Sequence, residues 1–151
     1  MTINIDRYQR KLARRISDFH GHFMSDSKWT KVFTALSQNN NLIEKCLIKS
    51  IPNSILQQID IPSLKNFGNT FDEKGIKDVM LGGPIPFKEI EWIEFPVRWT
   101  QERQMRNYTL EPLLFHQDIN EIKNIMDKVG QLETDVDSDQ LKIYGYRGST
   151  C

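Results

Sequence analysis

Three aspartates stand at alternate positions near the C-terminal end of the sequence: Asp135, Asp137 and Asp139. This spacing is that of the first three ligands of an EF-hand calcium loop. Such a loop also needs glycine at its sixth position and glutamate at its twelfth, where this chain has Gln140 and Tyr146. The pattern therefore favours a solvated turn, in which the carboxylates accept hydrogen bonds from the local backbone, over a metal site.

Histidines and paired acids could also support metal binding or catalysis. His20 and His22 are two residues apart and would point in different directions on a helix, and His116 is distant in the sequence. No carboxylate or cysteine stands near them at the spacing of a metal site, so we expect no metal and no cofactor. Glu91 and Glu94 would need a cleft to act as a glycosidase pair, and a chain of this size gives no sign of one.

Nucleophile and phosphate motifs are missing from the sequence. No G-x-S-x-G elbow occurs, and the serines and Cys46 lack a context that would activate them. The segment Gly82-Gly83-Pro84 lacks the spacing of a P-loop or a dinucleotide fingerprint, and the prolines 84 and 86 remove N–H groups that a phosphate loop would use. We predict a turn between strands there, no catalytic residue and no enzymatic activity.

The elements that must position these residues begin with two helices. Gly21 frays or ends the first, and the second begins at N-caps in residues 25–27 and ends at the asparagines 39–41. Apolar residues at helical spacing define one face of each helix. For the first helix they are Ile5, Tyr8, Leu12, Ile16, Phe19 and Phe23, and for the second Trp29, Val32, Phe33 and Leu36.

The rest of the chain predicts strands and one further helix. The strongest strand is 90–99, where aromatic and β-branched residues on both faces indicate a central position. We expect Trp29 and Trp92 in the core. The remaining expectations are a strand or short helix at 42–51, a short helix or irregular connector at 52–62, a turn-rich segment at 66–75, a strand at 76–81, a long loop at 100–109, a helix at 116–129 stopped by Gly130, and a hairpin of 132–136 with 141–146.

These elements predict the fold class. Helices and strands do not alternate strictly, which disfavours a doubly wound fold. We expect an α+β fold with a mostly antiparallel sheet of about four to five strands, on which the N-terminal helices and one later helix pack. At 151 residues, the chain has the length of one domain, so we assign residues 1–151 to a single domain.

Charge is balanced in total but not along the chain. Twenty Lys and Arg meet twenty Asp and Glu, which excludes a simple polycation and an acidic disordered tail. Residues 1–31 hold seven basic and three acidic residues, a local net charge of +4. Residues 111–140 hold eight acidic and two basic residues, a local net charge of −6. The neutral chain is therefore polarised.

The sequence also bears on location. No apolar run approaches the roughly 20 residues that cross a bilayer, and arginines interrupt the N-terminal apolar pairs, so we expect neither a membrane span nor a secretory leader. Cys46 and Cys151 are far apart, and a disulfide between a core segment and a chain end is not expected. These features favour the cytoplasm.

Acidic side chains in the last third are the candidates for contact with a partner. A surface rich in carboxylates can pair with a cationic active site, such as that of a nuclease, and electrostatic attraction accelerates the encounter. We predict that these side chains bind a protein partner. They are Glu133, Asp135, Asp137 and Asp139, with Glu111 and Asp118 as outer members.

Three segments resemble a family of small bacterial proteins. They are residues 28–33 (KWTKVF), 82–95 (GGPIPFKEIEWIEF) and 141–147 (LKIYGYR), a little under a fifth of the chain. That family is similar in size and helix–sheet layout to immunity proteins, which neutralise the toxins of contact-dependent or other secreted competition systems. The resemblance implies a cytoplasmic inhibitor that binds a cognate toxin domain and blocks its active site. It supplies no catalytic residue.

Two alternatives stay open. The basic N-terminal helix, with Arg7, Arg10, Arg14 and Arg15, could make the chain an RNA- or membrane-associated binding module. A small hydrolase with a site assembled in space is the other alternative, because triads need no sequence motif. Of these classes, the residues and the resemblance together favour a protein partner over nucleic acid.

Overall fold

A computed structural model describes residues 2–53, 55–77, 83–105 and 108–149. Its helices are α1 (Thr2–Ser17), α2 (Asp26–Gln38), α3 (Phe67–Thr70) and α4 (Ile119–Val129), with short 3₁₀ turns η1 (Asn40–Leu42), η2 (Leu64–Asn66) and η3 (Phe87–Glu89). Its strands are β1 (Phe19–His22), β2 (Cys46–Ser50), β3 (Gln57–Ile59), β4 (Gly75–Ile76), β5 (Ile85–Pro86), β6 (Ile90–Pro96), β7 (Arg98–Met105), β8 (Tyr108–His116), β9 (Thr134–Val136), β10 (Gln140–Tyr144) and β11 (Tyr146–Ser149).

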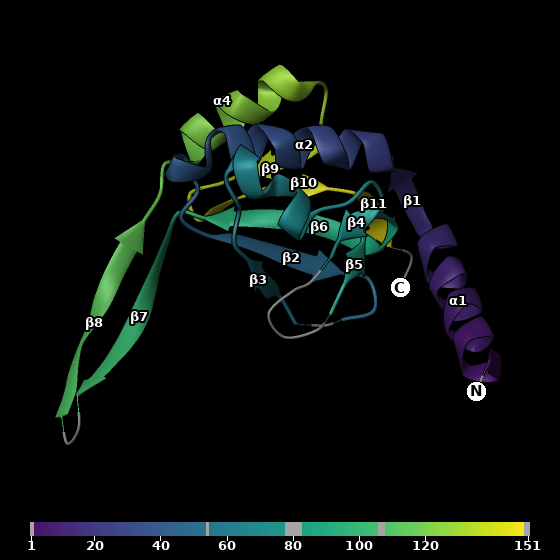
Figure 1. The fold of residues 1–151 in the computed structure, drawn as a ribbon, viewed down its shortest axis with the longest axis horizontal. Helices are drawn as coiled ribbons and strands as arrows, with labels where there is room; N and C mark the ends of the chain where they lie inside the picture. Colours follow the sequence, from purple (N-terminus) through teal and green to yellow (C-terminus); the bar gives the residue numbers. More distant parts are fainter. Residues whose placement is uncertain (1, 54, 78–82, 106–107, 150–151) are drawn as a thin grey trace.

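The main sheet has five antiparallel strands in the order β3-β2-β6-β10-β9. Strand β6 lies at its centre, where Ile93 is paired with Ile48 on one side and Ile143 on the other. Helices α2 and α4 cover one face of this sheet (Figure 1). The predicted α+β fold with a mostly antiparallel sheet is confirmed, as is the central position of the strand that begins at Ile90.

The core forms between the two covering helices and the sheet. The hydroxyl of Ser25 accepts a hydrogen bond from the backbone N–H of Lys28 at 3.1 Å, which caps α2. The apolar face of α2 is buried, and the ring of Phe33 stacks on Phe71 and Phe87 with centroids 4.6 and 5.7 Å apart. Helix α4 buries Ile119, Ile122 and Met126 in the same cluster.

The first helix is shorter than predicted. Helix α1 ends at Ser17, and Phe19 begins β1, which pairs antiparallel with β11 near the end of the chain. Phe19 and Phe23 have helical spacing from Ile16, but the ring of Phe19 instead stacks on Tyr146, with centroids 5.2 Å apart. A contact across the whole chain therefore overrides a local periodicity that would have continued the helix.

The predicted loop at 100–109 is wrong for residues 100–105 and 108–109, which form strands, whereas residues 106–107 lie outside the described residues. Strands β7 and β8 form an antiparallel hairpin in which Arg98 is paired with His116 and Met105 with Tyr108. The polar composition of β7 conceals its conformation, because its stability depends on pairing with the apolar strand that follows it. We call this hairpin, β7 with β8, the arm.

The short helix or irregular connector expected at 52–62 instead contains strand β3, which pairs with β2. Of the strand expected at 76–81, Ile76 lies in β4 and is paired with Ile85, whereas residues 78–82 lie outside the described residues. The terminal hairpin is confirmed, since β9 and β10 pair around the turn at residues 137–139.

Candidate functional site

The arm extends away from the body of the molecule, at the opposite end from α1 (Figure 1). At its base the rings of Trp99 and Phe115, which are directly paired across the two strands, stack with centroids 5.9 Å apart and planes at 10°. The ammonium group of Lys45 lies 5.4 Å from the centre of the Trp99 ring. Aromatic stacking and a cation–π contact therefore hold the base of the arm in place.

Beyond the base, the arm exposes apolar side chains. Leu114 is 70% exposed, Tyr108 is 71% exposed, and Leu113 is 40% exposed. Because successive strand residues point to opposite faces, Leu113 shares a face with Phe115 while Leu114 lies on the other. The pairing register shifts between Gln101 and Arg103, which marks a bulge in the middle of the arm. Apolar groups are therefore presented on both faces of a two-stranded ribbon.

Gln117 fixes the arm to the sheet. Its side-chain oxygen accepts hydrogen bonds from the backbone N–H groups of Glu44 and Lys45, at 2.9 and 3.1 Å. Its amide nitrogen donates to the backbone oxygens of Lys45 and Pro96, at 2.9 and 2.8 Å. This buried amide thus joins the end of β8 to the segment before β2 and to the end of β6. Sequence reasoning missed Gln117, because no local pattern marks a glutamine with distant partners.

The predicted carboxylates near β9 have partners within the chain. The guanidinium group of Arg147 lies 2.9 Å from Glu133 and 2.6 Å from Asp135, and the hydroxyl of Tyr144 donates to Asp135 at 3.1 Å. The hydrogen bond to Asp135 is the main cause that raises the pKa of Arg147. Burial, followed by the hydrogen bond to Asp135, raises the pKa of Tyr144. Arg147 therefore offsets one of the two negative charges in this part of the acidic surface.

Asp137 and Asp118 organise the backbone. The Asp137 carboxylate accepts from the N–H groups of Asp139 and Gln140 at 2.7 and 2.9 Å, which is the solvated turn that the sequence favoured. The Asp118 carboxylate accepts from the N–H groups of Asn120 and Glu121, at 3.0 and 3.2 Å, and caps α4.

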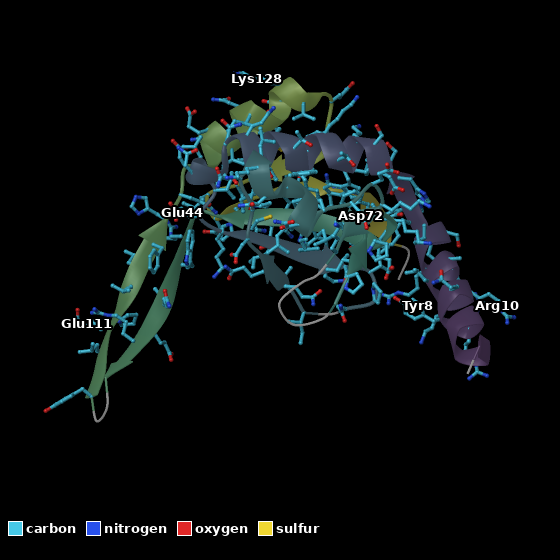
Figure 2. All side chains as sticks on the ribbon, in the orientation of Figure 1. Tyr8, Arg10, Glu44, Asp72, Glu111 and Lys128 are labelled. Atoms are coloured by element: carbon cyan, nitrogen blue, oxygen red, sulfur yellow. The ribbon has the colours of Figure 1, made fainter. Side chains whose placement is uncertain are left out.

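Three of the six predicted carboxylates lie on the arm or next to its base. Glu111 lies on β8, out along the arm (Figure 2). Asp118 follows β8 after Gln117, and Asp139 lies 3.7 Å from the guanidinium group of Arg98, where β7 begins. The structure therefore separates the carboxylates into three at the arm, two around Arg147 (Glu133 and Asp135), and Asp137, which binds the backbone of its own turn.

Trp92 was expected in the core, but it lies on the face of the main sheet opposite α2 and α4. Its indole N–H donates to Glu94 at 2.8 Å, and Lys142 lies 4.4 Å from the ring centre. Trp92 is half-buried, whereas Trp29 is 2% exposed in the core as expected. The indole N–H found a buried carboxylate partner on this face, because Glu94 is itself only 6% exposed.

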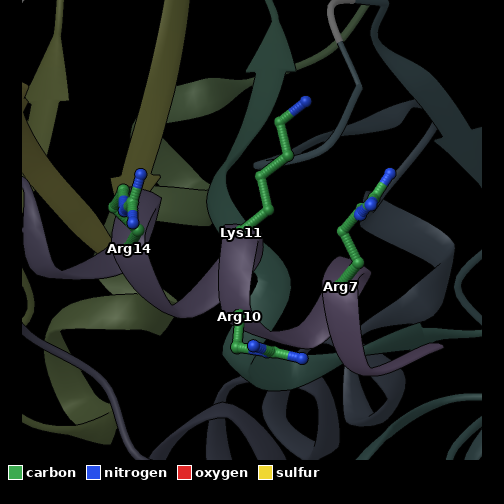
Figure 3. A pocket seen from close by; sticks show the side chains of 4 residues that line it. All are labelled: Arg7, Arg10, Lys11 and Arg14. Atoms are coloured by element: carbon green, nitrogen blue, oxygen red, sulfur yellow. The ribbon is translucent and has the colours of Figure 1, made fainter. Parts of the chain in front are cut away.

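Basic side chains of α1 surround a hollow at the other end of the molecule. Among the described residues, those that line its volume of about 360 Å³ are Arg7, Arg10, Lys11 and Arg14 (Figure 3). On the same helix, between Arg7 and Arg10 in the sequence, the hydroxyl of Tyr8 donates to the carboxylate of Glu89 at 2.8 Å. Burial and this hydrogen bond raise the pKa of Tyr8 to about 12.

Residues that could support a metal site or covalent chemistry are dispersed. In the described ranges, no three His, Cys, Asp or Glu side chains are grouped so that they could hold a metal ion. Cys46 is free and fully buried, and burial raises the pKa of its thiol, while Cys151 lies outside the described residues. None of the helices that the structure describes is long and apolar enough to span a bilayer.

Comparisons of the chain with protein-family models, with curated proteins and with solved structures give no match.

Proposed function

We propose that this chain is an immunity protein that binds a bacterial toxin domain and blocks its active site. The observation that carries the proposal is the arm, which presents Tyr108 and Leu114, each about 70% exposed, away from the core. The resemblance of residues 28–33, 82–95 and 141–147 to a family similar to immunity proteins supports the same assignment.

The physical argument concerns the stability of an isolated hairpin. A two-stranded ribbon is marginally stable in water, because few of its side chains can be buried. A partner that covers Leu114 and Tyr108 removes apolar area from water, at about 25 cal/mol per Å². The outer edges of β7 and β8 also offer unpaired backbone groups to a partner strand. A protein partner therefore supplies the packing that the arm lacks.

The carboxylates at the arm define the chemistry of that partner. Glu111, Asp118 and Asp139 are exposed and place carboxylates on the arm and beside its base, where Arg98 and Arg103 of β7 also lie. A toxin with a cationic active site, such as a nuclease, complements these carboxylates. Such a toxin acts on substrates in the cytoplasm, and the proposal therefore places this chain there.

The test begins with co-expression of the tagged chain and the product of the neighbouring reading frame. We expect the two products to co-purify, and cells that carry both to grow where the toxin alone arrests growth. In calorimetric titrations, Leu114→Asp should weaken binding at least tenfold, because it places a charge in the apolar contact. The matched control Leu64→Asp, at an exposed leucine outside the arm, should bind within about twofold of the unmodified chain.

Two results would contradict the proposal or part of it. Unchanged affinity of Leu114→Asp removes the arm from the interface, and failure to co-purify or to rescue growth removes the toxin partner. The carboxylates at the arm are tested separately by reversing the charge of Glu111 and Asp139 together. An affinity change within about 1 kcal/mol would exclude these two from the contact.

A further inference from the structure

The hollow on α1 carries a concentrated positive charge. Arg7 and Lys11 point side by side from the helix, with Arg14 one turn further along (Figure 3). At 1.5 Å of rise per residue, Arg7 and Lys11 are about 6 Å apart along the axis, and Lys11 and Arg14 about 4.5 Å. No ion pair among the described side chains includes any of these three residues. Their field is therefore available to an anionic ligand.

An aromatic ring lies beside these charges. Tyr8 is 43% exposed and lines a second hollow of about 140 Å³ together with Lys11, Leu12, Arg15 and Pro52. Lys11 lines both hollows and so joins the aromatic site to the basic one. The bond from Tyr8 to Glu89 holds the ring in place, because it fixes the hydroxyl at a distance of 2.8 Å from the carboxylate.

We propose that α1 binds single-stranded nucleic acid, with phosphates against Arg7, Lys11 and Arg14 and a base against the ring of Tyr8. A basic groove beside an aromatic platform is the combination by which proteins hold single strands without sequence preference. This site is distinct from the arm and gives the chain a second binding activity.

The packing of α1 argues against insertion into a membrane. An interfacial helix must turn its apolar stripe into the lipid. In this chain Leu12, at the centre of that stripe, is 4% exposed, and Tyr8 is bonded to Glu89. The apolar side of α1 around Leu12 is thus packed against the protein itself, whereas Arg7, Lys11 and Arg14 are exposed.

The test is fluorescence anisotropy of a labelled 12-nucleotide single-stranded RNA of mixed sequence, titrated with the full chain at several salt concentrations. The unmodified chain should bind with a strong salt dependence. The triple variant Arg7→Gln, Lys11→Gln and Arg14→Gln should lose most of the affinity, and the slope of log K against log salt should fall by about 2, at about 0.7 per phosphate contact on a single strand. The matched control removes three exposed lysines elsewhere, by Lys31→Gln, Lys65→Gln and Lys128→Gln, and should retain binding.

The aromatic contact has its own pair of variants. Tyr8→Ala should weaken binding about five- to hundredfold, whereas Tyr8→Phe, which keeps the ring, should stay within about threefold of the unmodified chain. Circular dichroism should show that each variant is folded. If the triple variant bound as tightly as the unmodified chain, the phosphate contact would be overturned. If Tyr8→Ala bound as tightly as Tyr8→Phe, the contact between Tyr8 and a base would be overturned.

Competition experiments identify the ligand class. Unlabelled RNA should displace the probe, and a mononucleotide should displace it only at much higher concentration, because it makes fewer phosphate contacts. If a mononucleotide displaced the probe at the same concentration as the RNA, the ligand of this site would be a single nucleotide and the proposal of a strand would be overturned. Equal displacement by poly-glutamate, or equal binding to anionic vesicles, would contradict the assignment to nucleic acid.

Discussion

At the scale of residues, the clearest structural role belongs to Gln117. Its side chain makes four hydrogen bonds to the backbone of Glu44, Lys45 and Pro96, and it is 6% exposed. Removal of a partner from a buried network leaves the other groups without hydrogen bonds and without water, at about 1–3 kcal/mol for each group. A single amide therefore connects the stability of the sheet to the position of the arm.

We predict that Gln117→Ala lowers the free energy of unfolding by about 2–4 kcal/mol, because several backbone groups lose their partner and the cavity admits water to only some of them. Urea unfolding followed by circular dichroism measures this change. The control Gln131→Ala, at an exposed glutamine between α4 and β9, should change the free energy of unfolding by less than about 0.5 kcal/mol. Equal effects of the two substitutions would show that the amide network does not stabilise the fold.

At the scale of elements, the arm is attached to the core but contributes little to it. The buried apolar side chains that the structure describes come from the helices, the main sheet, the short strands β4 and β5 and the connecting residues Ile51 and Phe71, and none lies between residues 101 and 113. The arm is fixed at its base by Trp99, Phe115 and Gln117. The fold therefore does not depend on the outer part of the arm, which is typical of a binding element on a rigid scaffold.

We predict that replacement of residues 101–113 by Asn-Gly, which forms a tight hairpin turn between Thr100 and Leu114, leaves the fold intact. The melting temperature should fall by no more than about 4 °C, which for a chain of this size corresponds to about 1 kcal/mol. Thermal unfolding followed by circular dichroism measures this shift. Loss of the cooperative transition in the shortened chain would show that the outer arm belongs to the folding unit.

At the scale of the whole molecule, opposite ends carry different chemistry. The arm, with its exposed apolar side chains, lies at one end, and the basic helix α1 lies at the other (Figure 1). Between them one apolar cluster joins α2, α4 and the five-stranded sheet. The net charge of +0 therefore conceals an uneven distribution along the chain, with a local net charge of +4 in residues 1–31 and of −6 in residues 111–140.

Because one cluster joins these elements, we predict that the chain unfolds in a single cooperative transition. Tryptophan fluorescence and far-ultraviolet circular dichroism should give coincident curves in urea, since Trp29 lies in the core while helix and strand content report on the backbone. Two separated transitions would instead mean that the sheet and the helices unfold as independent units.

Elements that are stabilised by groups close to one another in the sequence could be predicted from the sequence. Helix α2 begins after Ser25 because that hydroxyl caps the helix, and its buried face follows from the spacing of Trp29, Val32, Phe33 and Leu36. Strand β6 is recognisable from its aromatic and β-branched residues, and the turn at Asp137 from side chains that bind the neighbouring backbone. In each case the stabilising groups lie within a few residues of one another.

The acidic candidates show where prediction from the sequence stops. Their clustering along the chain is visible, but Arg147, the partner of Glu133 and Asp135, is at least twelve residues away. The contact between Asp139 and Arg98 crosses more than forty residues. Composition therefore located negative charge, whereas chain folding decided which carboxylates are paired and which lie at the arm.

The sequence by itself determined the fold class, the capped helix, the central strand and the uneven distribution of charge, because propensity, capping and periodicity act over a few residues. Only the tertiary structure decided that residues 98–105 and 108–116 pair as an arm, that Phe19 leaves the helix for a strand beside Tyr146, and that Gln117 holds the arm to the sheet. These features depend on contacts between distant segments, where packing and hydrogen bonding outweigh local preference.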